Sequence, residues 1–116
     1  MSYSEDLAER VRRVCVDHAN VTEKAMFGGV CFMSDGHMFI GIVGDTLMAR
    51  IGPDAYQRAL DEPHVREMDF TGRPMRGYVY VEPEGCATVK SLRRWVNLAA
   101  SFVSSLPPKK VRPAKA

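Results

Sequence analysis

The sequence lacks a hydrophobic run long enough to cross a bilayer. Its longest apolar stretch, residues 38–43, is interrupted by Gly41 and falls far short of the roughly 20 residues that a spanning helix needs. It also lacks the basic and then apolar start of a signal peptide, since it begins MSYSED. We therefore expect a cytoplasmic protein without membrane contacts. The chain has 116 residues, of which 46% are hydrophobic and 26% charged, as in one ordinary folded domain.

Cysteine is scarce, and its positions match neither a disulfide framework nor a zinc site. Cys15, Cys31 and Cys86 are an odd number at wide spacings, without a Cys-x-x-Cys pair. We predict that they are small, mostly buried side chains in a reducing compartment. The histidines share no motif, and the glycine pair at residues 28–29 lacks a phosphate-loop pattern and instead predicts a bend within a strand. We expect no catalytic residues, no metal and no cofactor, and hence no enzyme.

Positive charge is in excess only at the end of the chain. The sequence has 16 basic and 14 acidic residues, and four of the basic ones lie in residues 107–116, which contain no acid. Residues 1–106 therefore hold 12 basic and 14 acidic residues, a net charge of −2, and offer no broad phosphate-binding face. We predict a folded domain over residues 1–106 and a flexible basic tail over 107–116. The candidate nucleic-acid contacts, for weak binding only, are Lys109, Lys110, Arg112 and Lys115.

Hydropathy periods predict the element order α-β-β-β-α-β-β-α. The predicted helices are one that ends near Asn20, a short one from Pro53 to just before Pro63, and one over residues 88–106 that carries Trp95 in a wide apolar stripe. The predicted strands cover residues 26–33, 38–43, 46–51, 64–68 and 78–82. This order predicts an α+β domain with helices packed on a mostly antiparallel five-stranded sheet.

The loop predicted over residues 69–77 is the best candidate for a binding site, because long loops often carry function. Its arginines could hold an anion beside apolar neighbours, or they could pair with nearby carboxylates while Pro74 fixes a turn. The candidate binding residues of this loop are Asp69, Phe70, Arg73, Met75 and Arg76.

Aromatic and methionine side chains near the predicted sheet point to protein contacts. Tyr78 and Tyr80 share one face of their strand and could stack on nucleobases. We instead expect them under a helix or at a subunit contact, because no flanking basic positions accompany them in the sequence. Methionine adapts to irregular interfaces, so its enrichment favours a protein-binding face over a reaction pocket. The methionines in or beside the sheet are Met26, Met33, Met38, Met48, Met68 and Met75.

Two stretches together resemble the N-terminal domain of the TfoX/Sxy family, namely residues 26–32 (MFGGVCF) and 69–81 (DFTGRPMRGYVYV). The helix that carries Leu92, Trp95 and Val96 and the ending over residues 105–109 (SLPPK) are also similar, so the resemblance covers roughly residues 5–109. It implies an α-β(3)-α-β(2)-α fold akin to type III secretion chaperones. It also implies a role in regulating natural competence, together with the cyclic-AMP receptor protein. Family members normally carry a second, helical C-terminal domain, whereas ten residues follow residue 106 here.

The leading expectation is a non-enzymatic regulatory or protein-interaction domain. We expect its partner to be another protein or a second copy of the chain. We predict either a homodimer or a monomer with one exposed apolar sheet face, because three helices cannot cover both faces of a five-stranded sheet. Two alternatives stay open. One is a small-ligand-binding or enzymatic domain that uses the Asp69–Gly77 loop, and the other is weak nucleic-acid binding through the basic tail.

Overall fold

The computed structural model describes residues 3–16, 18, 21–26, 29–34, 36–68 and 76–106. Its helices are α1 (Glu5–Cys15), α2 (Pro53–Leu60) and α3 (Val89–Ser104), and a short 3-10 turn, η1 (Pro83–Cys86), precedes α3. Its strands are β1 (Val21–Met26), β2 (Gly29–Ser34), β3 (His37–Val43), β4 (Thr46–Arg50), β5 (Val65–Glu67) and β6 (Tyr78–Val81).

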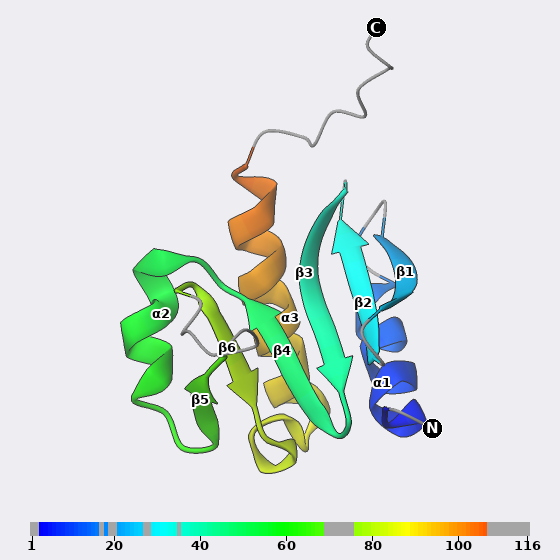
Figure 1. The fold of residues 1–116 in the computed structure, drawn as a ribbon, viewed down its shortest axis with the longest axis horizontal. Coiled ribbons are helices and arrows are strands. Elements are labelled where there is room, and N and C mark those ends of the chain that lie inside the picture. The colour runs from blue at the N-terminus through cyan, green and yellow to red at the C-terminus, as the bar shows by residue number, and fades with distance from the viewer. Residues whose placement is uncertain are drawn as a thin grey trace, which may run out of the picture.

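The strands form one antiparallel sheet in the order β1-β2-β3-β4-β6-β5 (Figure 1). This confirms the predicted α+β fold. The predicted number of five strands is wrong, because the sheet described here has six. Met26 at the end of β1 pairs with Gly29 at the start of β2, so the stretch predicted as one bent strand belongs to two antiparallel strands. A Cβ at Gly29 would lie 2.2 Å from the carbonyl oxygen of Ile42, so the close approach of β3 requires glycine there.

The additional strand, β1, escaped prediction because its sequence, VTEKAM, does not alternate. Residues Thr22–Ala25 are all exposed, as they can be on an edge strand that pairs on one side only. The predicted first helix is also too long, since α1 ends at Cys15 rather than near Asn20. The other predicted strands and helices agree with the structure to within two residues at most ends, and α2 begins at Pro53 as predicted.

The hydrophobic core lies on one face of the sheet, beneath the helices. Side chains from all three described helices join one buried cluster, to which α3 contributes Leu92, Trp95 and Val96. Most strand residues in this cluster alternate along the chain: Val30 and Phe32, Ile40 and Ile42, Leu47 and Ala49, and Val79 and Val81. Phe39, the neighbour of Ile40, also joins the cluster, where the register between β2 and β3 shifts by one residue. Figure 1 shows α1 and α3 behind the sheet, while α2 packs beside β5 and β6. None of the helices in the described part of the chain is both long and apolar enough to cross a bilayer.

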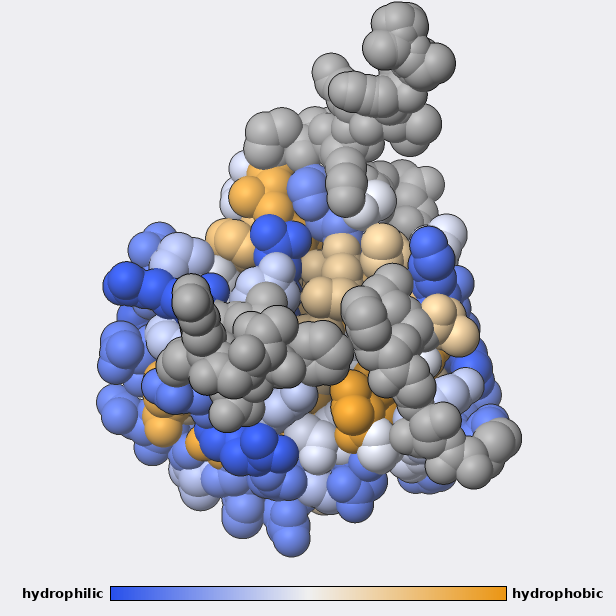
Figure 2. Space-filling view, in the orientation of Figure 1, coloured by the Kyte–Doolittle hydropathy of each residue, from blue (hydrophilic) through white to orange (hydrophobic). Residues whose placement is uncertain are grey.

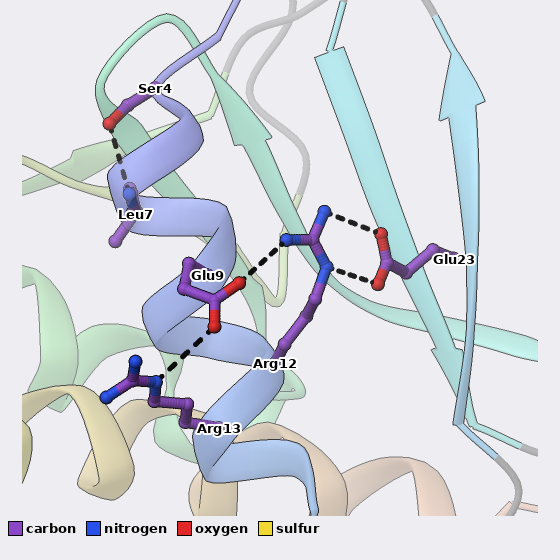
Figure 3. A network of polar contacts seen from close by, with 6 residues as sticks. All are labelled: Ser4, Leu7, Glu9, Arg12, Arg13 and Glu23. Carbon is purple, nitrogen blue, oxygen red and sulfur yellow. Dashed lines mark hydrogen bonds and ion pairs between the residues drawn. The ribbon is translucent and has the colours of Figure 1, made fainter.

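A pair of charged side chains joins the edge strand β1 to α1 (Figure 3). Arg12 donates from Nε to Oε2 of Glu23 over 2.6 Å and from Nη2 to Oε1 over 3.1 Å. Glu9 accepts from both Arg12 and Arg13, and Ser4 caps α1 by accepting from the amide of Leu7. Because the Arg12–Glu23 pair is more than one-third exposed, it orients β1 and contributes no more than about 1 kcal/mol of stability.

Candidate binding surface

The face of the sheet opposite the core carries no helix among the described residues, and we call it the helix-free face. Side chains alternate along a strand, so the neighbours of the core residues point to this face. The strand register aligns one residue from each strand in a continuous row across it. In sheet order, this row consists of Lys24, Cys31, Gly41, Met48, Tyr80 and Arg66.

Methionine side chains from β2, β3 and β4 lie on the helix-free face. Met33 and Met38 are paired on β2 and β3 and are half-buried. Met48 is buried, and its terminal methyl group lies over Gly41. A Cβ added at Gly41 would lie only 2.7 Å from the Cε atom of Met48. Val43, on the same face, is 43% exposed. Figure 2 views this side of the molecule and shows apolar surface near its middle, with polar residues around it.

Arginine side chains stack on the two tyrosines of β6. The guanidinium of Arg66 lies 4.6 Å from the ring centroid of Tyr80, and that of Arg50 lies 5.5 Å from the ring centroid of Tyr78. Both tyrosines are half-buried on the helix-free face, so they do not pack under a helix. The view that no basic positions flank them is wrong, because β4 and β5 bring Arg50 and Arg66 beside β6 from distant parts of the chain.

The two stacked arginines differ in their polar partners. Arg66 forms an ion pair with Glu82, so its charge is balanced. Arg50 also lies 5.5 Å from the ring centroid of Phe102 on α3, and no described residue accepts a hydrogen bond from it or forms an ion pair with it. Among the described residues, no carboxylate therefore balances the charge of Arg50 at the rim where β4 ends and β6 begins.

This rim contains a hollow of about 180 Å³. The described residues that line it are Arg50, Gly52, Pro53, Arg76, Gly77, Tyr78 and Phe102. The carbonyl oxygen of Gly77 accepts hydrogen bonds from the amides of Ile51 and Gly52, over 2.8 and 3.1 Å. These bonds fix the start of α2 against the turn that precedes β6, so the walls of the hollow are held by backbone contacts.

Glycine is required in these walls. Gly52 has a φ of 88° and Gly77 a φ of 92°, in the left-handed region that other residues avoid. A Cβ at Gly52 would also lie 2.3 Å from Cδ1 of Phe102. The ring of Phe102 can therefore close the hollow only because residue 52 has no side chain.

Of the predicted loop residues, the structure describes Arg76, which is exposed at the hollow and has no carboxylate partner among the described residues. The other four, Asp69, Phe70, Arg73 and Met75, lie outside the described residues, as do Lys109, Lys110, Arg112 and Lys115. Sequence reasoning missed Arg50 and Phe102 as neighbours of Arg76. The only local signal in the sequence is a glycine shortly after each of the two arginines, Gly52 after Arg50 and Gly77 after Arg76. A glycine near an arginine is too common to predict a site.

The three cysteines are buried, as predicted. Burial raises the pKa of the Cys15 thiol to about 11, with a smaller contribution from the carboxylate of Glu23, and burial also raises the pKa values of Cys31 and Cys86. These thiols are therefore protonated and weakly nucleophilic near neutral pH. Within the described ranges, no group of three or more His, Cys, Asp and Glu side chains could hold a metal ion.

Comparison with known proteins gives one match. The family model described as TfoX N-terminal domain matches residues 14–103, which include every described strand and α2 and nearly all of α3. No curated protein and no solved structure matches the chain.

Proposed function

Since the chain belongs to the TfoX N-terminal domain family, we propose that it is a non-enzymatic regulatory domain that acts in the cytoplasm by binding protein through its helix-free face. The observation that carries the proposal is the location of every described helix on the other side of the sheet. This arrangement leaves methionine, tyrosine and arginine side chains as the surface that a partner would meet. Participation in competence-type transcription regulation rests on the family alone and is part of the proposal.

The residue types on the helix-free face support protein binding. Tyrosine, methionine and arginine are enriched in protein interfaces, where lysine, glutamate and aspartate are depleted. Tyr78, Tyr80 and Met38 are half-buried and so keep accessible surface. Glu82 is the acidic partner of Arg66, so that pair adds little net charge. Among the described residues of this face, a partner would therefore have to desolvate few unpaired carboxylates.

A second copy of the chain is the first partner to test. Six strands at a spacing of about 4.8 Å and a length of about five residues give a flat footprint of roughly 500 Å². Stable complexes bury about 800 Å² on each partner. We therefore expect a dimer formed by this face alone to be weak, with dissociation in the micromolar range or above.

Two exposed valines provide a matched test. Val43 is 43% exposed on the helix-free face, and Val89 is 59% exposed at the start of α3. We expect Val43→Lys to weaken self-association at least tenfold in sedimentation equilibrium, because it places a charge in the interface, and Val89→Lys to have no such effect. Thermal unfolding of both variants would establish that they remain folded.

Two results would count against the proposal. A wild-type protein that stays monomeric at every concentration would refute the homodimer. If quantitative cross-linking in cells then recovered the same partner proteins at the same yield with both valine variants, protein binding through the helix-free face would be refuted as well.

A further inference from the structure

We propose that the hollow between Arg50 and Arg76 binds one oxyanion group, either a carboxylate or a phosphate. This site lies at the edge of the sheet where β4 ends and β6 begins, and it is separate from the middle of the helix-free face. Anion binding in this hollow does not depend on protein binding by the helix-free face.

The contacts of Arg50 are the first argument. A guanidinium has five N–H donors in its plane and no acceptor, so aromatic rings that stack on it leave those donors unsatisfied. The rings of Tyr78 and Phe102 both lie 5.5 Å from the guanidinium, and no described residue accepts its hydrogen bonds. The stacking restricts the orientation of the side chain before any ligand arrives, so less conformational entropy is lost on binding.

The charge of the hollow is the second argument. Arg76 lines it beside Arg50 and has no carboxylate partner among the described residues, and no described acidic residue lines it. Asp54, in the first turn of α2, lines a different hollow between α2 and α3. Elsewhere on the described surface, Arg12, Arg66 and Arg94 each pair with a glutamate, whereas Arg58 and Arg93, like Arg50 and Arg76, form no ion pair with a described residue. Two neighbouring arginines with no counterion among the described residues form a local site for a negative group.

The size of the hollow limits the ligand. Pockets for drug-sized ligands enclose about 300–1,000 Å³, whereas this hollow encloses about 180 Å³. It therefore fits one anionic group, and the rest of a larger ligand would lie outside. The same chemistry is offered by a free carboxylate or phosphate and by an acidic or phosphorylated side chain of a peptide.

The test uses the full chain and nuclear magnetic resonance. Inorganic phosphate, succinate and a phosphoserine tripeptide are each titrated at constant ionic strength, with chloride as the reference anion. We expect saturable shifts of the Gly52 and Gly77 amides and of the Arg50 Nε–H signal. Similar affinity for phosphate and the tripeptide would indicate a free small anion, and at least tenfold tighter binding of the tripeptide would indicate a side chain of a polypeptide.

Four variants separate binding at this site from a general effect of positive charge. We expect Arg76→Gln and Arg50→Gln each to weaken binding at least tenfold. Arg93→Gln removes the same charge from an exposed position on α3 and should leave binding unchanged. Because Arg50→Gln also removes ring contacts, Arg50→Lys serves as a second variant that keeps the charge and loses the planar donors. Shifts equal to those with chloride, or an equal loss in Arg93→Gln, would overturn the proposal.

Discussion

The indole Nε1 of Trp95 donates a hydrogen bond to the carbonyl oxygen of Gly85 over 3.3 Å. Trp95 is 1% exposed, so this bond satisfies the one polar atom of the largest fully buried side chain in the described core. Gly85 belongs to η1, which links β6 to α3. The bond therefore fixes the central helix of the core against the chain segment that leads into it.

Trp95→Ala should destabilise the domain by about 3–5 kcal/mol, because it leaves a large cavity and removes the bond to Gly85. Trp95→Phe keeps most of the ring burial and should cost clearly less. Urea unfolding followed by circular dichroism would measure both values. A midpoint for Trp95→Ala close to that of the wild type would contradict the placement of this ring at the centre of the core.

Gly52→Ala should destabilise the domain more than Gly44→Ala. Both glycines have positive φ values, of 88° and 61°, so each substitution strains the backbone by about 1–3 kcal/mol, and the cost is larger at Gly52, whose ψ of 160° places it in a region that almost only glycine adopts. A Cβ at Gly44 meets nothing within 4 Å, whereas one at Gly52 would collide with the ring of Phe102. Thermal unfolding should therefore show an additional loss for Gly52→Ala, and equal losses would contradict the contact with Phe102.

The stability of the domain should decrease as the pH rises from about 9 to 11. Burial raises the pKa of Cys15 from about 9 to about 11, so in this range the unfolded chain releases the thiol proton first. The native state then binds more protons than the unfolded state, and a rise in pH favours unfolding, by up to about 2–3 kcal/mol over the range. Cys15→Ala should show a shallower alkaline decline in urea midpoints. Identical slopes would show that Cys15 does not cause the effect.

Removal of residues 107–116 should leave the thermal midpoint unchanged, since they contain three prolines and no apolar periodicity. The same truncation should abolish most binding to DNA, which in the full chain should be weak and without sequence preference. Four basic side chains neutralise at most about four phosphates, so the logarithmic salt slope should be no steeper than roughly −3 to −4. Unchanged DNA binding after truncation would place that site in the folded domain.

The sequence by itself determined the elements with strong local patterns. The apolar stripe of α3, the alternation of Val79 and Val81 in β6, and Pro53 at the start of α2 are each set by neighbouring residues, so a period of 3.6 or 2 residues was enough to find them. The edge strand β1 has no such pattern, because it pairs on one side only and Thr22–Ala25 are exposed.

Only the tertiary structure decided which residues share the candidate sites. Arg50, Arg76 and Phe102 come from the end of one strand, the turn before another and the last turns of a helix, and backbone contacts bring them together. Strand order and register place Arg50 and Arg66 beside the tyrosines of β6, and a shift of one residue would turn those side chains to the opposite face. The period of a strand predicts which of its side chains share a face. Which distant strands pair, and in what register, depends on the packing of the whole core, and no local sequence pattern records that packing.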